Sequence, residues 1–315
     1  MKKLIIKSLV YFVLLLLVLE IIVRIFHLAK DNPIRFIDAH NVEKWKPNQE
    51  GYSVTGNRKQ NVAKYHINKS GFNSYREFAP AKDKIEIALV GDSFVEGFHQ
   101  DYNNSIGKKI ETELNDAVEV YEYGYAGYDF ADQLHLIEAY KEDFNLIDKV
   151  YIYLKFKDDL KRDEYKVSYA RMQLETPLNK ALREVKLLVY TQNIGFLDSA
   201  KSLMGKVLSF GKLKKSKKGK EEKQNKNELY ISNFNNLVEK YNYNKDKFVL
   251  FFEGGDEVPN EFLSFLNENK FKYINLSQAF EKSKFPVTLI YDKHWNNHGR
   301  DIVAQEIASY HKQNQ

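Results

Sequence analysis

Apolar and polar positions along the chain alternate between strand-like runs and helical spacing from Ile85 onward. Residues 85–97 form an apolar, β-branched run that ends in a tight Gly-Asp-Ser turn, which is typical of a buried strand leading into a helix. Similar runs predict four more strands, at 118–123, 150–156, 248–252 and 273–276. Helical spacing of apolar residues predicts helices at 105–114, 130–144, 230–241, 260–269 and 301–311. This alternation predicts an α/β fold for residues 85–315.

The N-terminal residues 4–28 are almost continuously apolar, and lysines precede their densest part, Leu9–Val23. This length and charge pattern predicts one membrane span within residues 1–30, with the N-terminus in the cytoplasm. Glu20 and Arg24 lie one helical turn apart near its far end and can pair. The alternative is a cleaved signal peptide, but residues 26–30 do not supply its small-x-small site.

Two segments break the strand and helix pattern. Residues 31–84 are polar with scattered Pro and Gly, which indicates an extended lead-in held against the domain by aromatic side chains. These aromatics are Trp45, Tyr52, Tyr65 and Phe72. An insertion follows the third strand, at about 161–228. Its residues 178–210 predict two amphipathic helices, which serve either core packing or a membrane surface. Lys212–Lys226 holds eight lysines and predicts a mobile, solvated loop.

Composition narrows the classes of function. The chain has 315 residues, of which 43% are hydrophobic, enough for a sizeable core. It has no cysteine, which excludes disulfides, thiolate zinc sites and cysteine nucleophiles. The net charge of +5 is mild and arises partly in one lysine-rich loop, so no nucleic-acid partner is expected.

Catalytic residue types gather at two places. Ser93 follows the first predicted sheet strand, and ligands bind at such strand ends in open α/β sheets. Asp292 and His294 lie two residues apart, so in an extended loop they leave the same side and form an acid and base pair. Two alternatives remain open: a capping Asp beside a packing His, and a metal site of Asp292, His294 and His298.

Three motifs in this order resemble the SGNH/GDSL hydrolase superfamily. They are Gly91-Asp92-Ser93-Phe94, Gly124-Tyr125-Ala126-Gly127-Tyr128 and Asp292-Lys293-His294-Trp295-Asn296. The stretch Ile67–Phe72 is similar to the lead-in of bacterial, membrane-anchored members, which include enzymes that deacetylate or O-acetylate cell-envelope polysaccharides. The resemblance implies a flavodoxin-like, three-layer fold with a five-stranded parallel sheet.

The resemblance also implies roles for single residues. Ser93 is expected to be the nucleophile, His294 its base and Asp292 the acid that orients the base. The backbone N–H groups of Ser93 and Gly127 are expected in the oxyanion hole. An Asn that donates to the oxyanion in the family is replaced here by Asp158, and an ionised carboxylate accepts hydrogen bonds only.

We therefore expect a serine esterase or O-acyltransferase that acts on acyl esters, such as acetyl esters, of cell-envelope glycans and needs no cofactor. The chain would be a single-pass protein of the bacterial inner membrane, with its domain outside the cytoplasm. A transferase would receive its acyl group from a multi-spanning membrane partner. The alternative is a catalytically inactive scaffold or a glycan-binding protein of the same fold.

Overall fold

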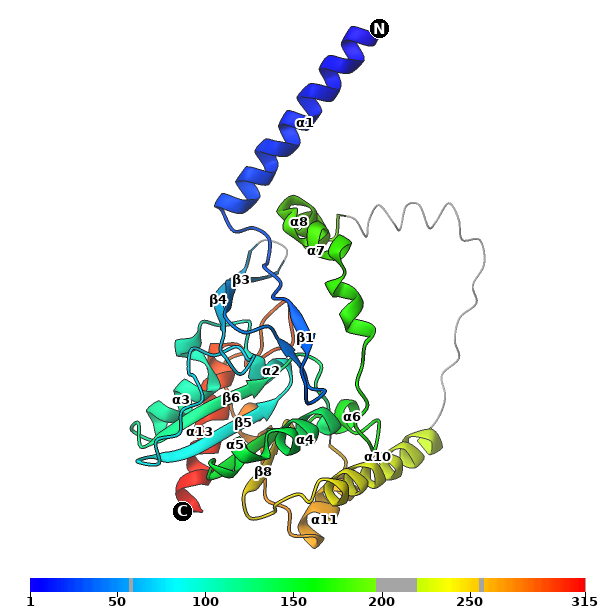
Figure 1. Cartoon of the computed structure of the whole chain (residues 1–315). Coiled ribbons are helices and arrows are strands. Elements are labelled where there is room, and N and C mark those ends of the chain that lie inside the picture. The colour runs from blue at the N-terminus through cyan, green and yellow to red at the C-terminus, as the bar shows by residue number, and fades with distance from the viewer. Residues whose placement is uncertain (57–58, 197–219, 255–257, 315) are drawn as a thin grey trace.

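A five-stranded parallel sheet forms the centre of the computed structural model, which describes residues 1–56, 59–196, 220–254 and 258–314 (Figure 1). The strands lie in the order β6-β5-β7-β8-β9, which is the flavodoxin-like order. Their bounds are β5 (Ile85–Gly91), β6 (Val118–Gly124), β7 (Lys149–Tyr153), β8 (Phe248–Phe252) and β9 (Tyr273–Asn275). The predicted α/β class and five-stranded parallel sheet are confirmed.

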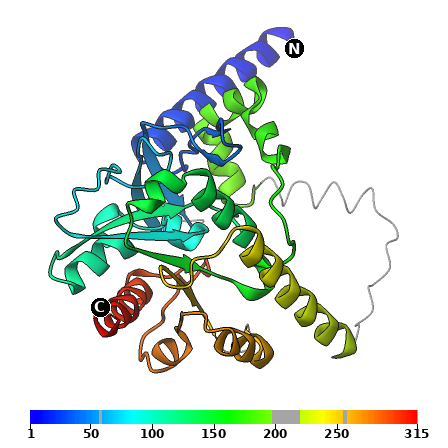
Figure 2. The ribbon, with the colours of Figure 1, turned by 60° about the horizontal axis from the view of Figure 1, so that its bottom comes forward.

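Helices cover both faces of this sheet because its central strands are apolar on both sides (Figure 2). Ile87 and Leu89 pack toward α3 (Ile106–Glu113) and α13 (Asn297–Gln313). Ala88 and Val90 point to the other face. That face is covered by α4 (Phe130–Ala139), α5 (Lys141–Asn145), α10 (Lys220–Lys240) and α11 (Asn260–Glu268). The result is the three-layer arrangement expected for this strand order.

Local capping sets several helix bounds. The helix predicted over 130–144 is interrupted at Tyr140, which ends α4 and precedes α5. The last helix begins at Asn297, earlier than predicted, because the Asn296 side chain accepts the Gly299 N–H at 2.8 Å. Short helical elements complete the domain: α2 (Ser93–Glu96), η1 (Tyr102–Asn104), α6 (Phe156–Asp159) and α12 (Ser277–Glu281).

The lead-in contains two antiparallel hairpins that the sequence did not predict. β1 (Arg35–Ile37) pairs with β2 (Glu43–Trp45), and β3 (Gln49–Thr55) pairs with β4 (Asn61–Ile67). Of the four aromatics expected to hold this segment, three are buried and Tyr52 is half-buried. The lead-in is therefore a folded part of the domain's upper surface in Figure 1.

The insertion also departs from its prediction. The expected helix through Leu178 and Val189 is broken at Val185 into α7 (Pro177–Glu184) and α8 (Lys186–Asn193), preceded by η2 (Ala170–Glu175). The second expected helix, at 197–207, lies outside the described residues. The loop predicted over 212–226 is wrong from Lys220 onward, where α10 begins, because good helix formers there run into apolar positions that pack on the domain.

The N-terminal helix α1 (Lys2–Ile25) projects from the domain (Figure 1). It is long and apolar enough to cross a membrane, and nearly all of its side chains are exposed. Glu20 and Arg24 pair at 2.6 Å, as their spacing predicts.

Candidate active site

The end of β5 delivers Ser93 to the first position of α2. Asp92 caps this helix by accepting the Phe94 N–H at 2.9 Å, and the buried Asp92 carboxylate also pairs with Lys155. Gly97 ends the helix in the left-handed conformation, with φ +66°. The nucleophile candidate therefore stands on one fixed helical turn at the carboxyl edge of the sheet.

His294 contacts both of its predicted partners. Its Nε2 lies 2.7 Å from the Ser93 Oγ, and its Nδ1 forms a short hydrogen bond with the Asp292 carboxylate. Asp292 also accepts the His294 backbone N–H at 2.9 Å. The structure thus brings Ser93, His294 and Asp292 together in the order that general-base activation of a serine requires.

The loop that carries Asp292 and His294 is anchored by its C-terminal neighbours. Trp295 is fully buried and donates its ring N–H to Glu253 at 2.5 Å. The Asn296 side chain donates to the carbonyls of Pro286 and Thr288 while it caps α13. These contacts fix the imidazole relative to a helix that belongs to the core.

A second histidine, which the sequence analysis missed, completes the cluster. The His99 Nε2 lies 3.3 Å from the free carboxylate oxygen of Asp292, and its ring stacks on His294 with centroids 4.1 Å apart. Gly97 turns the chain back after α2, and this turn returns His99 to the site. A lone His six residues after the serine gives no pattern from which this contact could be found.

Burial, and then the neighbouring His294, lowers the pKa of His99 to about 4, so its ring is neutral at neutral pH. Because a carboxylate only accepts, the proton of this ring lies on Nε2 and is donated to Asp292. Burial would raise the pKa of Asp292, but hydrogen bonds from the backbone and ring of His294 outweigh it and hold that pKa below its usual value. Asp292 is therefore ionised and bound from two sides.

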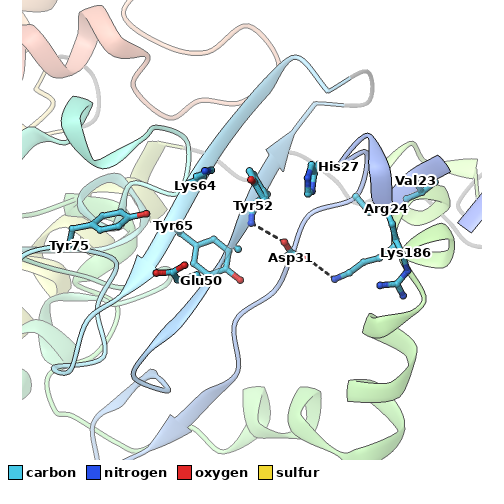
Figure 3. A pocket seen from close by; sticks show the side chains of 12 residues that line it. Val23, Arg24, His27, Asp31, Glu50, Tyr52, Lys64, Tyr65, Tyr75 and Lys186 are labelled. Atoms are coloured by element: carbon cyan, nitrogen blue, oxygen red, sulfur yellow. Dashed lines mark hydrogen bonds and ion pairs between the residues drawn. The ribbon is translucent and has the colours of Figure 1, made fainter. Parts of the chain in front are cut away.

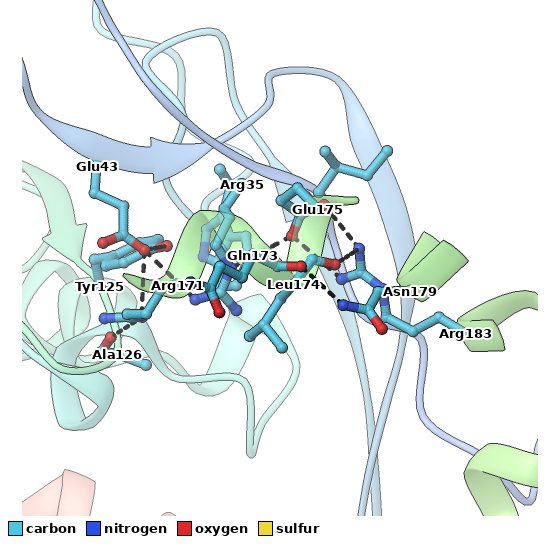
Figure 4. A network of polar contacts seen from close by, with 12 residues as sticks. Arg35, Glu43, Tyr125, Ala126, Arg171, Gln173, Leu174, Glu175, Asn179 and Arg183 are labelled. Carbon is cyan, nitrogen blue, oxygen red and sulfur yellow. Dashed lines mark hydrogen bonds and ion pairs between the residues drawn. The ribbon is translucent and has the colours of Figure 1, made fainter. Parts of the chain in front are cut away.

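The loop after β6 contributes the other wall of the site. Gly127 has φ +88°, a conformation that favours glycine, and the neighbouring Ala126 carbonyl accepts a hydrogen bond from Arg171 at 2.6 Å (Figure 4). Arg171 belongs to η2 of the insertion and also pairs with Glu43 at 3.2 Å. Within the described residues, the N–H groups of Ser93 and Gly127 donate to no protein acceptor. Ser93 and the neighbouring Ala126 line the same cleft.

Glu96, on α2, supports the same loop from below. Its carboxyl accepts the Trp45 ring N–H at 2.7 Å and the Ala126 backbone N–H. Burial raises the pKa of Glu96 to about 7. Trp45 of the lead-in, the helix α2 and the loop after β6 thus meet at the buried carboxyl group of Glu96.

Asp158 lies away from this site. Its side chain is 64% exposed, pairs with Lys161 at 2.7 Å and does not line the cleft that holds Ser93. The next residue, Asp159, is buried and accepts the Lys155 N–H at 2.7 Å. Burial, and then the nearby Asp92, raises the pKa of Asp159 well above its usual value. Asp158 therefore offers no group to the cleft that holds Ser93.

A metal site is less compatible with this geometry. His298 contacts Ser283 at 2.8 Å instead of joining Asp292 and His294. His99, Asp292 and His294 do offer three ligand atoms within 4.8 Å of one another. However, both ring nitrogens of His294 already bind Asp292 and Ser93, so metal ligation by His294 would break one of these two contacts.

The site opens into a cleft of about 770 Å³. Its floor holds Ser93, Asp292 and His294, while its walls come from residues 30–33, the β3 end at 53–56 and Asn193 at the end of α8. A separate pocket of about 440 Å³ lies between the end of α1 and the β3–β4 hairpin (Figure 3). Its lining mixes cationic, acidic and tyrosine side chains.

No protein-family model matches the chain, and no curated protein matches it significantly. Among solved structures, it is similar to a lipase/acylhydrolase from Enterococcus faecalis, with a TM-score of 0.42 and 12% identity over 73% of this chain and 96% of that one. It is also similar to a member of the lipolytic G-D-S-L family from Veillonella parvula, with a TM-score of 0.40 and 14% identity over 73% of this chain and 99% of that one. For a carbohydrate acetylesterase family member from Sinorhizobium meliloti, the TM-score is 0.36 and the identity 9%, over 73% of this chain and 98% of that one. All three TM-scores lie below 0.5.

Proposed function

We propose that the protein is a serine esterase or O-acyltransferase that cleaves or transfers a small acyl group such as acetyl through an acyl-Ser93 intermediate. The contact of 2.7 Å between the His294 Nε2 and the Ser93 Oγ, with Asp292 on the opposite ring nitrogen, is the observation that supports it most. An inactive scaffold would be favoured by a serine and histidine far apart.

In the first half-reaction, His294 Nε2 takes the Ser93 proton as the Oγ attacks the acyl carbonyl carbon. The oxyanion forms beside the N–H groups of Ser93 and Gly127. As the ester bond breaks, His294 returns the proton to the leaving alcohol oxygen, and the acyl group stays on Ser93. Water or a sugar hydroxyl then gives its proton to His294, attacks the acyl carbon and releases the Ser93 Oγ, which regains that proton.

We further propose that α1 anchors the protein in the bacterial inner membrane with its N-terminus in the cytoplasm and its domain outside. The lysines before the apolar run and the exposed side chains of α1 support this topology. The substrate would be an acylated glycan of the cell envelope, which agrees with a cleft large enough for sugar residues. A multi-spanning membrane protein would supply the acyl group if the enzyme is a transferase.

Labelling of the full chain in detergent with a fluorophosphonate probe tests the nucleophile. We expect the wild type and the His298→Ala variant to label, and Ser93→Ala and His294→Ala to lose labelling. His298 is the matched control, because it lies on the same segment but contacts Ser283. No labelling of folded wild-type protein, or equal labelling of the His294→Ala variant, would contradict the proposed mechanism.

A further inference from the structure

The far end of α1 is bound directly to the insertion. The two carboxylate oxygens of Glu20 accept the backbone N–H groups of Lys186 and Leu187 at 3.0 and 2.7 Å. Glu20 therefore caps the N-terminus of α8 from another helix. Arg24 donates to the Glu184 carbonyl, and Lys186 pairs with Asp31 at 2.7 Å, as Figure 3 shows for the latter pair.

Apolar packing continues this junction. Val23 of α1, Ala29 and Val189 of α8 form a buried cluster of their own. In Figure 1, α7 and α8 accordingly lie beside the base of α1. The insertion is thus held to the anchor helix by both polar and apolar contacts.

The position of Glu20 along α1 sets the depth of the junction. A bilayer core of roughly 30 Å needs about 20 helical residues, so a span that begins at Leu4 extends to Val23. Glu20 then lies within one turn of the lipid boundary. Because Glu20 binds the first N–H groups of α8, the break between α7 and α8 at Val185 lies at the same depth.

The helix α7 has its polar face turned toward the protein and its apolar face outward. Arg183 pairs with Glu175 at 2.7 Å, and the Asn179 side chain donates to the Gln173 carbonyl at 2.8 Å (Figure 4). No residue of α7 is buried. The outward apolar side chains are Leu178 and Leu182 of α7 and Val185, the residue that ends it, which are 69%, 43% and 46% exposed.

This orientation is the reverse of a helix that packs on a water-soluble core, and it is expected for a helix whose outer surface meets lipid. We propose that the α7–α8 hairpin is an interfacial foot, in which Leu178, Leu182 and Val185 rest in the bilayer surface beside α1. The proposal depends on the membrane anchoring proposed above. Lipid is the occupant we choose because the hairpin joins the anchor helix at the depth where the bilayer ends.

The foot would also orient the active site. Residues 30–33, just after α1, and Asn193, at the end of α8, line the same cleft as Ser93. When the α7–α8 hairpin lies on the bilayer surface, this side of the cleft faces the membrane. An ester on a membrane-bound carrier would then reach Ser93 more readily than one on a distant soluble polymer.

The absence of cysteine makes single-cysteine labelling site-specific. The full chain would be reconstituted into phosphatidylethanolamine and phosphatidylglycerol vesicles, with an NBD fluorophore at Leu182→Cys and quenching by doxyl lipids. Lys180→Cys is the matched control, because Lys180 lies two residues before Leu182 and therefore on the opposite side of the same helix. Ser264→Cys, exposed on α11, reports a position far from the membrane, and Leu15→Cys reports the interior of α1.

We expect a shallow doxyl lipid to quench the label at 182 at least about twice as strongly as the labels at 180 and 264. A label at 182 that is no better quenched than that at 264, while a deep doxyl lipid quenches the label at 15, would overturn the foot. If the label at 15 is also unquenched, the membrane anchoring itself fails. If the label at 182 is shielded from water in native membranes but not in vesicles, a protein partner and not lipid covers this position, and the proposal is also overturned.

Discussion

Replacing Gly124 with alanine tests how the fold positions the nucleophile. Gly124 ends β6 directly beside α2, the helix that begins at Ser93. A Cβ at this position would lie 2.0 Å from the Glu96 N and 2.4 Å from the Val95 carbonyl carbon. Both are backbone atoms, so no side-chain rotation relieves the overlap.

The size of the effect follows from these distances. Ordinary contact begins near 3.4 Å, so α2 must retreat from β6 by about 1.4 Å. The hydrogen bond between Ser93 and His294 is 2.7 Å long and does not survive a displacement of this size unless the histidine loop follows. A misplacement of about 1 Å costs roughly 100-fold in rate. Overpacking of this kind destabilises a protein by about 1–3 kcal/mol.

The assay is the rate of fluorophosphonate labelling, measured at a temperature where circular dichroism shows the variant to be folded. We expect labelling of Gly124→Ala to slow by about 100-fold while most of the protein stays folded. Gly195→Ala is the control, since a Cβ there meets no heavy atom within 4 Å; its φ is positive, so the substitution strains the backbone there without pushing on α2. Labelling of Gly124→Ala at the wild-type rate would refute the idea that close packing of α2 on β6 places Ser93.

Three further substitutions address the electrostatics of the site. His99→Phe keeps a ring beside His294 but removes the donor to Asp292. Labelling should therefore slow by about tenfold, and the acid limb of its pH–rate profile should move to higher pH. An unchanged profile would contradict this role of His99. The raised pKa of Glu96 means that the folded state holds a proton which the unfolded state releases from about pH 4.5. Its stabilisation is fully present below that pH and is lost as the pH rises through about 7. From pH 5 to 8 the wild type should therefore lose about 2.5 kcal/mol more than Glu96→Gln in urea unfolding. Equal losses would show that Glu96 is ionised in the fold. Asp158→Asn should label within about twofold of the wild type, because its side chain faces solvent, whereas a gain near 100-fold would place it in the oxyanion hole.

The sheet and its nucleophile turn were predictable because their signals are local. Apart from Glu86, Ile85–Gly91 is apolar on both faces, as expected for a strand covered by helices. The turn that ends such a strand places Ser93 at the carboxyl edge. The two-residue spacing of Asp292 and His294 likewise indicates a shared side without knowledge of the fold. Each of these inferences needs only the chain's own periodicity.

The remaining features depend on contacts between distant segments. The hairpins of the lead-in have short strands with mixed polarity, and their burial is set by the β6 loop and α2 rather than by their own pattern. His99 acquires its contact with Asp292 only when Gly97 reverses the chain. At the end of β7, one turn of helix turns Asp158 to solvent and Asp159 inward, and a single residue of register there has no sequence signal.

The architecture explains why these less predictable parts gather in one place. In a parallel sheet of this order the ligand site lies at the carboxyl edge, so segments that leave the strands there form its walls. The lead-in reaches this edge through Trp45 on Glu96, and the insertion reaches it through Arg171 on the Ala126 carbonyl. The insertion also binds α1 through Glu20, and the lead-in binds the residue that follows α1, where Lys59 donates to the Phe26 carbonyl. The core therefore positions Ser93, Asp292 and His294, while the segments joined to α1 and to the residue after it shape the cleft. Specificity should change with substitutions in these segments before it changes with substitutions in the sheet.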